Sequence, residues 1–176
     1  GKYEGDFYSF EDAFQYPSPI DIPVWGGGSA PIAVKRAWNC CDGWLPGRIN
    51  MPSFRQGVKS LKKWSNEESK PMPTVGAIPI TSIGRDRDQA IEKVNLKGLI
   101  KAAKPFWMKP ESGVFETVED LEGVLMAGGP EDIVREVEKF KNAGVNHLVF
   151  DMRQRFDDME ECMEIISDEV MPEFRK

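Results

Sequence analysis

The sequence has very little histidine or cysteine: only His147, and Cys40, Cys41 and Cys162. It therefore offers no Ser/His/Asp arrangement and no Cys/His spacing typical of zinc, so hydrolase and metalloenzyme functions have little support and no metal site is predicted. Three cysteines, two of them adjacent, do not form a disulfide framework. Such sparse cysteine use favours the reducing cytoplasm as the location.

An excess of positive charge and long apolar runs are missing as well. The 23 Lys and Arg residues are outnumbered by 29 Asp and Glu residues, which gives a formal net charge of −6. Binding to nucleic acids or anionic membranes needs clustered cations, so we expect neither partner. The apolar runs are too short to span a membrane, and the N-terminus lacks the apolar core of a signal peptide.

What remains is an ordinary globular composition, with 40% hydrophobic and 30% charged residues in 176. Residues 1–176 are predicted to form one α/β unit, in which 1–21 are an extended lead-in and 22–176 hold four βα units. Apolar runs and helical spacing predict these elements: strands at about 22–25, 42–46, 74–80 and 145–150, and helices at about 31–39, 52–64, 86–102, 117–120, 130–143 and 159–172. This alternation predicts parallel strands, in either a small open sheet or half of an eight-stranded barrel.

A glycine-rich turn follows the first predicted strand. Gly26, Gly27, Gly28 and Ser29 lie between that strand and a helix with an early proline, Pro31. Glycines let the backbone approach an anion, and the first amide groups of a helix are unpaired, so a phosphate is the natural ligand. The alternative is a tight turn in which Ser29 only caps the helix.

Three other features favour structural roles. Trp44 is more typical of a core than of a flavin-binding wall, and the lone His147 of a hydrogen-bonded structural position. The Gly128–Gly129 pair precedes another helix, but Glu131 and Asp132 already supply the negative charge that this helix end favours.

Four segments, in order, resemble the luciferase-like monooxygenase superfamily, whose members are flavin- or deazaflavin-dependent oxidoreductases on a (β/α)8 barrel. Residues 23–46 are similar to the family's fifth strand, phosphate loop, helix and sixth strand. Residues 127–133 resemble its Gly-Thr-Pro-Glu helix start, with Gly129 in place of threonine. Residues 141–150 resemble the final helix-to-strand passage, and 169–175 the C-terminal ending.

The resemblance implies an α/β fold that is the C-terminal half, strands 5–8 with their helices, of a TIM barrel. It implies FMN or F420 as cofactor and a small organic substrate. By position it implies that Gly27, Gly28, Ser29, Ala30 and Trp44 contact the cofactor, whereas no catalytic residue matches, because those are expected in the other half.

A complete barrel takes about 250 residues. We therefore expect a complementary N-terminal half-barrel chain, a homo-oligomer, or a sequence that covers part of a larger protein; the start at Gly1, without an initiator Met, favours a processed or partial chain. The main hypothesis is an oxidoreductase in which this half holds the cofactor phosphate and lines the substrate pocket. The alternatives are a flavin-binding protein without turnover and an assembly subunit.

Overall fold

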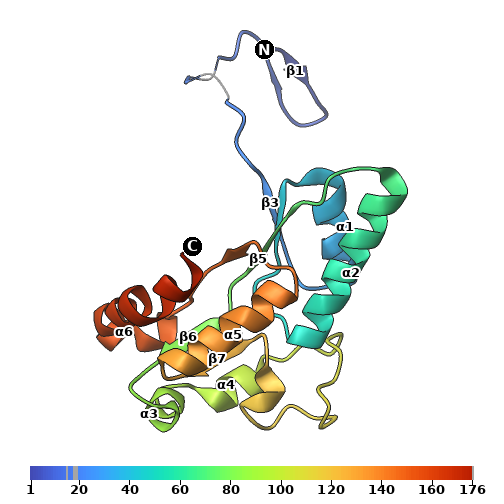
Figure 1. Ribbon diagram of the computed structural model, residues 1–176. Helices are drawn as coiled ribbons and strands as arrows, with labels where there is room; N and C mark the ends of the chain where they lie inside the picture. Colours follow the sequence, from blue (N-terminus) through green and yellow to red (C-terminus); the bar gives the residue numbers. More distant parts are fainter. Residues whose placement is uncertain (15, 18–19, 176) are drawn as a thin grey trace.

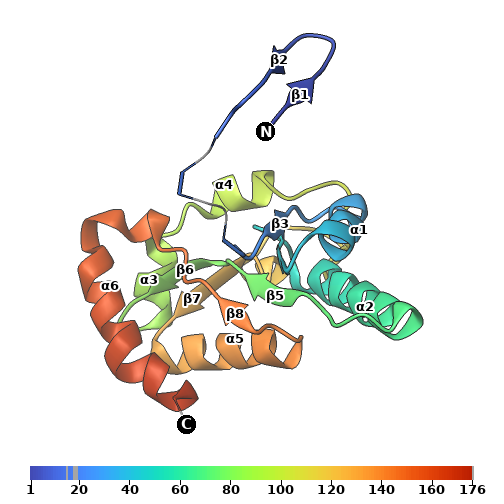
Figure 2. The same ribbon diagram turned by 90° about the horizontal axis from the view of Figure 1, so that it is seen from above.

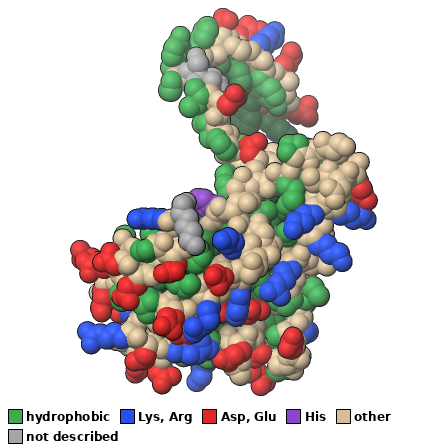
Figure 3. All heavy atoms as spheres, viewed as in Figure 1, with side chains coloured by type: hydrophobic (Ala, Val, Ile, Leu, Met, Phe, Trp, Pro, Cys, Tyr) green, Lys and Arg blue, Asp and Glu red, His purple; other side chains and the backbone are tan. Residues whose placement is uncertain are grey.

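The N-terminal residues form an arm that stands away from the rest of the molecule (Figure 1). In this computed structural model, residues 1–14, 16–17 and 20–175 are described. The strands β1 (Tyr3–Glu4) and β2 (Ser9–Phe10) pair as an antiparallel hairpin, and the rings of Tyr3 and Phe10 stack across it at 5.6 Å. The predicted lead-in thus contains a hairpin, while residues 15, 18 and 19 of the prediction lie outside the described residues. Hydrophobic side chains gather on this arm (Figure 3).

The central sheet has four parallel strands in the order β3-β4-β5-β8. They are β3 (Trp25–Gly27), β4 (Gly43–Leu45), β5 (Thr74–Ala77) and β8 (His147–Leu148). β4 pairs in register with β3 and β5, and β5 pairs with β8 through Gly76 and His147. The predicted succession of four parallel strands is confirmed, although the last strand is shorter than residues 145–150.

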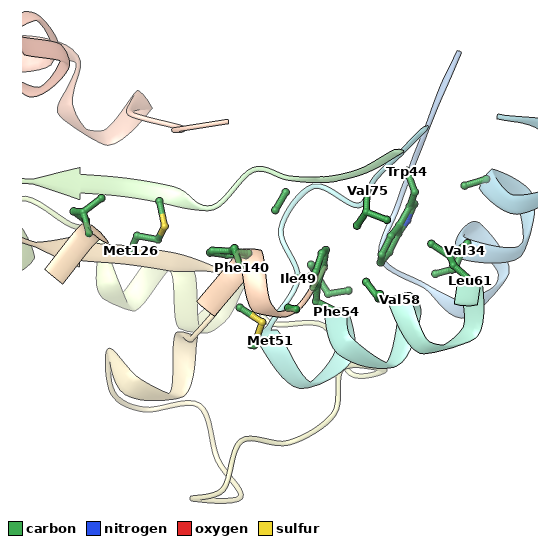
Figure 4. Close-up of a cluster of buried hydrophobic side chains, with 14 of the residues drawn as sticks. Val34, Trp44, Ile49, Met51, Phe54, Val58, Leu61, Val75, Met126 and Phe140 are labelled. Atoms are coloured by element: carbon green, nitrogen blue, oxygen red, sulfur yellow. The ribbon is translucent and has the colours of Figure 1, made fainter. Parts of the chain in front are cut away.

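Helices cover one face of this sheet (Figure 2). They are α1 (Pro31–Cys40), α2 (Met51–Glu68), α5 (Pro130–Asn142) and α6 (Met159–Ile165), the last continued by a π turn (Ile166–Val170) and a 3-10 turn (Met171–Phe174). Under them Trp44 stacks on Phe54 with ring centroids 5.4 Å apart, and Phe140 meets Phe54 edge-on at 6.2 Å. These fully buried rings form the centre of the core (Figure 4).

The other face of the sheet is open. A Cβ atom on Gly43 or Gly76 would lie within 3 Å of the Trp25 indole, so this ring lies flat over two glycines of neighbouring strands. The same ring packs at a tilt against that of His147, with centroids 5.4 Å apart. Both Trp25 and His147 are exposed. Exposure of the inner face is what an open half-barrel predicts.

The third predicted strand is in fact two strands. β5 ends at Ala77, and β6 (Ile80–Ile83) resumes after Pro79, which has no N–H to donate to a ladder. β6 pairs in parallel with β7 (Leu125–Gly128). The sequence analysis missed this strand because its apolar run is short and the glycines after it were assigned to the start of the next helix. This second ladder extends the molecule at the carboxyl end of β5.

The helix predicted over residues 86–102 is also two helices, α3 (Arg87–Glu92) and α4 (Leu96–Lys101). Asp86 caps α3, because its side chain accepts from the amide of Gln89. Asn95 then starts α4, because its side chain accepts from the amide of Gly98. In Figure 1 both helices lie at the end of the molecule opposite the N-terminal arm.

A buried arginine attaches the C-terminal segment to the second ladder. Arg155, in the 3-10 segment Arg153–Asp158, is 3% exposed. It donates to the Ser82 hydroxyl and the Ile83 carbonyl and forms a two-bond pair with Asp158. This pair raises the pKa of Arg155 and lowers that of Asp158. In the described part of the chain, no helix is both long and apolar enough to cross a membrane.

Asp120 anchors the irregular segment that follows α4, next to the short 3-10 helix Glu119–Leu121. Its carboxylate accepts from the hydroxyl of Ser112 (2.5 Å), the amides of Glu116 and Thr117 (3.0 and 2.8 Å) and the Thr117 hydroxyl (2.9 Å). The Asp120 amide also donates to the Thr117 hydroxyl at 3.4 Å, so the two residues are bonded reciprocally. These bonds hold the pKa of Asp120 well below its usual range, and the bond from the Ser112 hydroxyl has the largest effect.

This lowered pKa predicts an acid-dependent loss of stability. A carboxyl whose folded pKa lies below its unfolded value of about 3.9 stabilises the fold above that pH, and the contribution disappears as pH falls towards the folded pKa. We expect Asp120→Asn to lower the melting temperature at pH 7. The difference in melting temperature between this variant and the unchanged chain, here called the gap, should narrow below pH 4. Thermal denaturation from pH 7 to pH 2 measures this gap; a gap independent of pH would contradict the prediction.

Candidate functional site

The glycine turn lies at the carboxyl end of β3. Gly28 has φ +99°, a left-handed conformation that favours glycine, and Gly27 and Gly28 are exposed. The N-cap of α1 is Ala30, without a side-chain hydrogen bond, and Pro31 starts the helix. Ser29 therefore does not cap the helix, which corrects one prediction. Its hydroxyl instead accepts a hydrogen bond from Trp107.

Two indole groups hold the turn in place from different directions. The Trp44 Nε1–H donates to the carbonyl oxygen of Gly28 at 3.1 Å, and the Trp107 Nε1–H donates to the hydroxyl of Ser29 at 3.3 Å. Trp44 is fully buried on the helix-covered side of the sheet. It therefore holds the turn from the buried side of the sheet. The predicted contact between the Trp44 ring and a cofactor stays a prediction.

A pocket of about 300 Å³ adjoins the turn. Its walls come from the turn, from the segment after β4 and from the segment after α4: Gly28, Ser29, Pro46, Arg48, Ala102, Lys104 and Trp107. Because the turn and Arg48 follow the carboxyl ends of adjacent parallel strands, the pocket lies at the edge where α/β folds bind ligands. Its volume is at the lower end for ligand sites, enough for a phosphate and the start of its attached chain.

The electrostatics of this pocket suit an anion. Arg48 and Lys104 are its only charged residues, and both are exposed. Among the hydrogen bonds of the described residues, none uses the amide of Ser29 or Ala30 as a donor. Cations, unpaired amides and the N-terminus of a helix are the kinds of group that bind phosphate, and the pocket wall contains or adjoins each of them, with no carboxylate among its residues.

A second cavity, of about 440 Å³, touches Ser29 from the outer side, between α1 and α2. Its walls are largely apolar and include Ile32, Trp64 and Phe106, with Lys35 as its charged residue. The Lys35 ammonium lies over the Trp64 ring at 4.3 Å. The smaller pocket is therefore the better match for a charged ligand, despite its size.

The other candidate residues lie elsewhere. The amide of Gly129 donates to Asp132 at 3.0 Å, so this carboxylate occupies the N-terminus of α5 and the structural interpretation holds. The His147 ring makes no hydrogen bond among the described residues, contrary to prediction, and instead packs on Trp25. Burial raises the pKa of the Cys162 thiol, which leaves it unreactive. The described residues contain no group of three or more His, Cys, Asp or Glu placed to hold a metal ion.

Sequence reasoning missed three residues of the pocket, namely Arg48, Lys104 and Trp107. Arg48 follows the second strand directly, and a search for cations just past strand ends would have found it. Lys104 and Trp107 lie in a segment without periodicity, more than 70 residues after the glycine turn. No local signal in the sequence connects them with it.

The family model for luciferase-like monooxygenases matches residues 2–147. The chain belongs to this family. The matched region includes the glycine turn, Arg48 and the segment with Trp107, so the pocket lies wholly within it.

Relatives and solved structures of this family match nearly the whole chain. A 5,10-methylenetetrahydromethanopterin reductase of Methanopyrus kandleri is 26% identical over 99% of the chain, and an F420-dependent glucose-6-phosphate dehydrogenase of Amycolatopsis mediterranei is 23% identical over 99%. The structure of the F420-dependent tetrahydromethanopterin reductase of Methanopyrus kandleri superimposes with a TM-score of 0.77 at 22% identity, over 99% of the chain. An F420-dependent secondary alcohol dehydrogenase gives 0.72 at 20% identity, over the whole chain.

The chain spans little more than half of these proteins: 58% and 56% of the two relatives, and 58% and 56% of the two structures. Together with the four parallel strands and the open inner face, this coverage identifies the fold as part of a luciferase-like TIM barrel. The expectation of a partial barrel is confirmed.

Proposed function

We propose that this chain supplies the cofactor-phosphate site of a luciferase-like oxidoreductase, with F420 as the favoured cofactor and FMN as the second choice. The pocket beside Gly28 and Ser29 is the observation that carries the proposal. F420 is preferred because one relative and both solved structures reported above are named as F420-dependent. FMN is kept because a riboflavin lyase structure with modified FMN matches the fold with a TM-score of 0.61.

The residues present fit such a group. F420 and FMN both present a phosphate, and the donor set of this pocket suits one. In the proposed complex the amides of Ser29 and Ala30 donate to the phosphate oxygens, while Arg48 and Lys104 balance their charge. Gly27 leaves room for this approach, because a Cβ atom there would meet only the Leu45 carbonyl, at 3.9 Å.

The cofactor ring supplies the redox chemistry when bound, and this half of the barrel binds and orients it. The open inner face, with Trp25 and His147, would line the interior once the barrel is complete. His147 is the first residue of β8, and Trp25 is the first residue of β3. Both therefore lie below the carboxyl edge, and neither is assigned to catalysis of the small organic substrate.

A binding titration tests this proposal. The chain is mixed with F420, FMN and riboflavin in separate experiments, followed by equilibrium dialysis and by the visible absorbance that stays with the protein. We expect F420 and FMN to bind. Riboflavin lacks the phosphate, so it should bind at least about tenfold more weakly, which corresponds to the loss of one or more charge-assisted hydrogen bonds.

Each result has a distinct meaning. Retention of neither F420 nor FMN would overturn the proposal. Binding of riboflavin as tight as that of FMN would also contradict it, because the phosphate would then contribute nothing. Native mass spectrometry of the same samples reports whether a second chain, either another copy or a complementary half-barrel, accompanies the bound cofactor.

A further inference from the structure

We infer that Trp107 is a positioning residue that orients the Ser29 hydroxyl so that its proton points at a phosphate in the pocket. This inference rests on the proposed function and adds to it a residue from outside the βα turn. It also assigns a role to the irregular segment after α4, which the sequence analysis left without one.

The direction of the hydrogen bond carries the argument. An indole N–H donates and has no acceptor atom, so in the contact of 3.3 Å the Ser29 oxygen must be the acceptor. The hydroxyl proton of Ser29 is then turned away from Trp107. The hydrogen bonds of the described residues include none in which the Ser29 hydroxyl donates, so this proton is available to a ligand.

The pocket lies where that proton can be used. Both Ser29 and Trp107 line it, together with Arg48 and Lys104. A hydroxyl that accepts one hydrogen bond while donating another is polarised by the first, which strengthens the second. The Ser29 hydroxyl would therefore add a third type of donor to the phosphate, beside the amides and the cations.

Trp107 is itself fixed in position. Its side chain is 4% exposed, and its ring meets Phe115 edge-on at 6.2 Å. The next residue, Met108, is held at both of its backbone groups: its amide donates to the Ser53 hydroxyl at 2.7 Å, and its carbonyl accepts from the Asn50 amide group at 2.7 Å. The segment that carries the indole N–H is therefore hydrogen-bonded to the start of α2.

A double-mutant cycle tests the inference. Trp107→Phe removes the N–H and keeps an aromatic ring, Ser29→Ala removes the hydroxyl, and the two are combined. Affinity for inorganic phosphate, FMN and F420 is measured for each variant by titration calorimetry. We expect Ser29→Ala to weaken binding about tenfold and Trp107→Phe about threefold to tenfold, whereas in the Ser29→Ala background Trp107→Phe should have no further effect.

Trp38→Phe is the matched control. It also removes an indole N–H that is hydrogen-bonded, to Glu68 at 3.1 Å, but near the C-terminal ends of α1 and α2 and outside the pocket. We expect it to leave phosphate affinity unchanged. Melting temperatures measured for all variants separate a loss of fold from a loss of binding.

The outcomes are separable from those of the proposed function. Additive effects of the two substitutions, an unchanged affinity in Trp107→Phe, or no phosphate binding by the unchanged chain would each overturn the inference. Phosphate binding with the predicted coupling, but no retention of FMN or F420, would support the inference while overturning the proposed cofactor.

Discussion

Replacement of Gly28 with aspartate is expected to weaken the binding of F420 or FMN by at least about a hundredfold. A unit negative charge about 4 Å from another at an effective dielectric constant of about 20 interacts by about 4 kcal/mol, and a hundredfold loss needs only about 2.8 kcal/mol. Gly28 is exposed and lines the pocket, so a carboxylate at this position would add a negative charge beside the proposed phosphate. Titration with both cofactors measures the loss.

Two control variants isolate the effect of charge. Gly28→Ala brings the same backbone strain at φ +99° and the same contact of a new Cβ atom with Ala33 at 2.8 Å, but no charge. Gly113→Asp brings a carboxylate at another positive φ, +81°, in open space outside the pocket. We expect a modest loss in the first and none in the second. Equal losses in Gly28→Ala and Gly28→Asp would show that backbone geometry, and not charge, controls binding.

Local patterns were enough to predict most of the elements beside the central sheet. Pro31 and Pro52 stand in the first turn of α1 and α2, and Gly144 adopts φ +101° just after α5. Each signal acts within one helical turn, so the boundaries of these helices were predicted to within a few residues. The alternation of strands and helices then fixed the parallel direction of β3, β4, β5 and β8.

The missed features depend on partners far away in the sequence. β7 exists because it pairs with β6, some 45 residues earlier, and a run of four apolar residues does not reveal such a partner. The split between α3 and α4 depends on Asn95, whose amide is also bound by the distant Gln154. Spacing alone favoured one continuous helix, since Ile91 and Val94 share a stripe with Gly98.

The candidate site divides in the same way. The glycine turn was predictable, because flexible residues between an apolar strand and a helix are a local pattern. Arg48, Lys104 and Trp107 were not, because only the folded chain brings their segments to one pocket. Ser29 shows the difference within one residue: its place before a helix predicted a cap, and a tryptophan 78 residues later determined its actual contact.

Truncation of Phe54 to alanine is expected to lower the free energy of unfolding by about 3–5 kcal/mol. Its ring is fully buried between Trp44 and Phe140, so its truncation leaves a cavity at the centre of the core. Urea denaturation followed by circular dichroism measures the change. Phe156→Ala is the matched control, because Phe156 is 75% exposed and its truncation should change stability by less than about 0.5 kcal/mol.

The same variant connects the core with the candidate site. Trp44 rests on Phe54, and its indole N–H holds the carbonyl of Gly28. If the core supports the turn, Phe54→Ala should weaken phosphate binding under conditions in which the chain is still folded, although Phe54 lies outside the pocket. An unchanged phosphate affinity in the folded variant would mean that the turn keeps its shape without the contact between Trp44 and Phe54. A stability loss below about 1 kcal/mol would mean that neighbouring side chains fill the space left by the Phe54 ring.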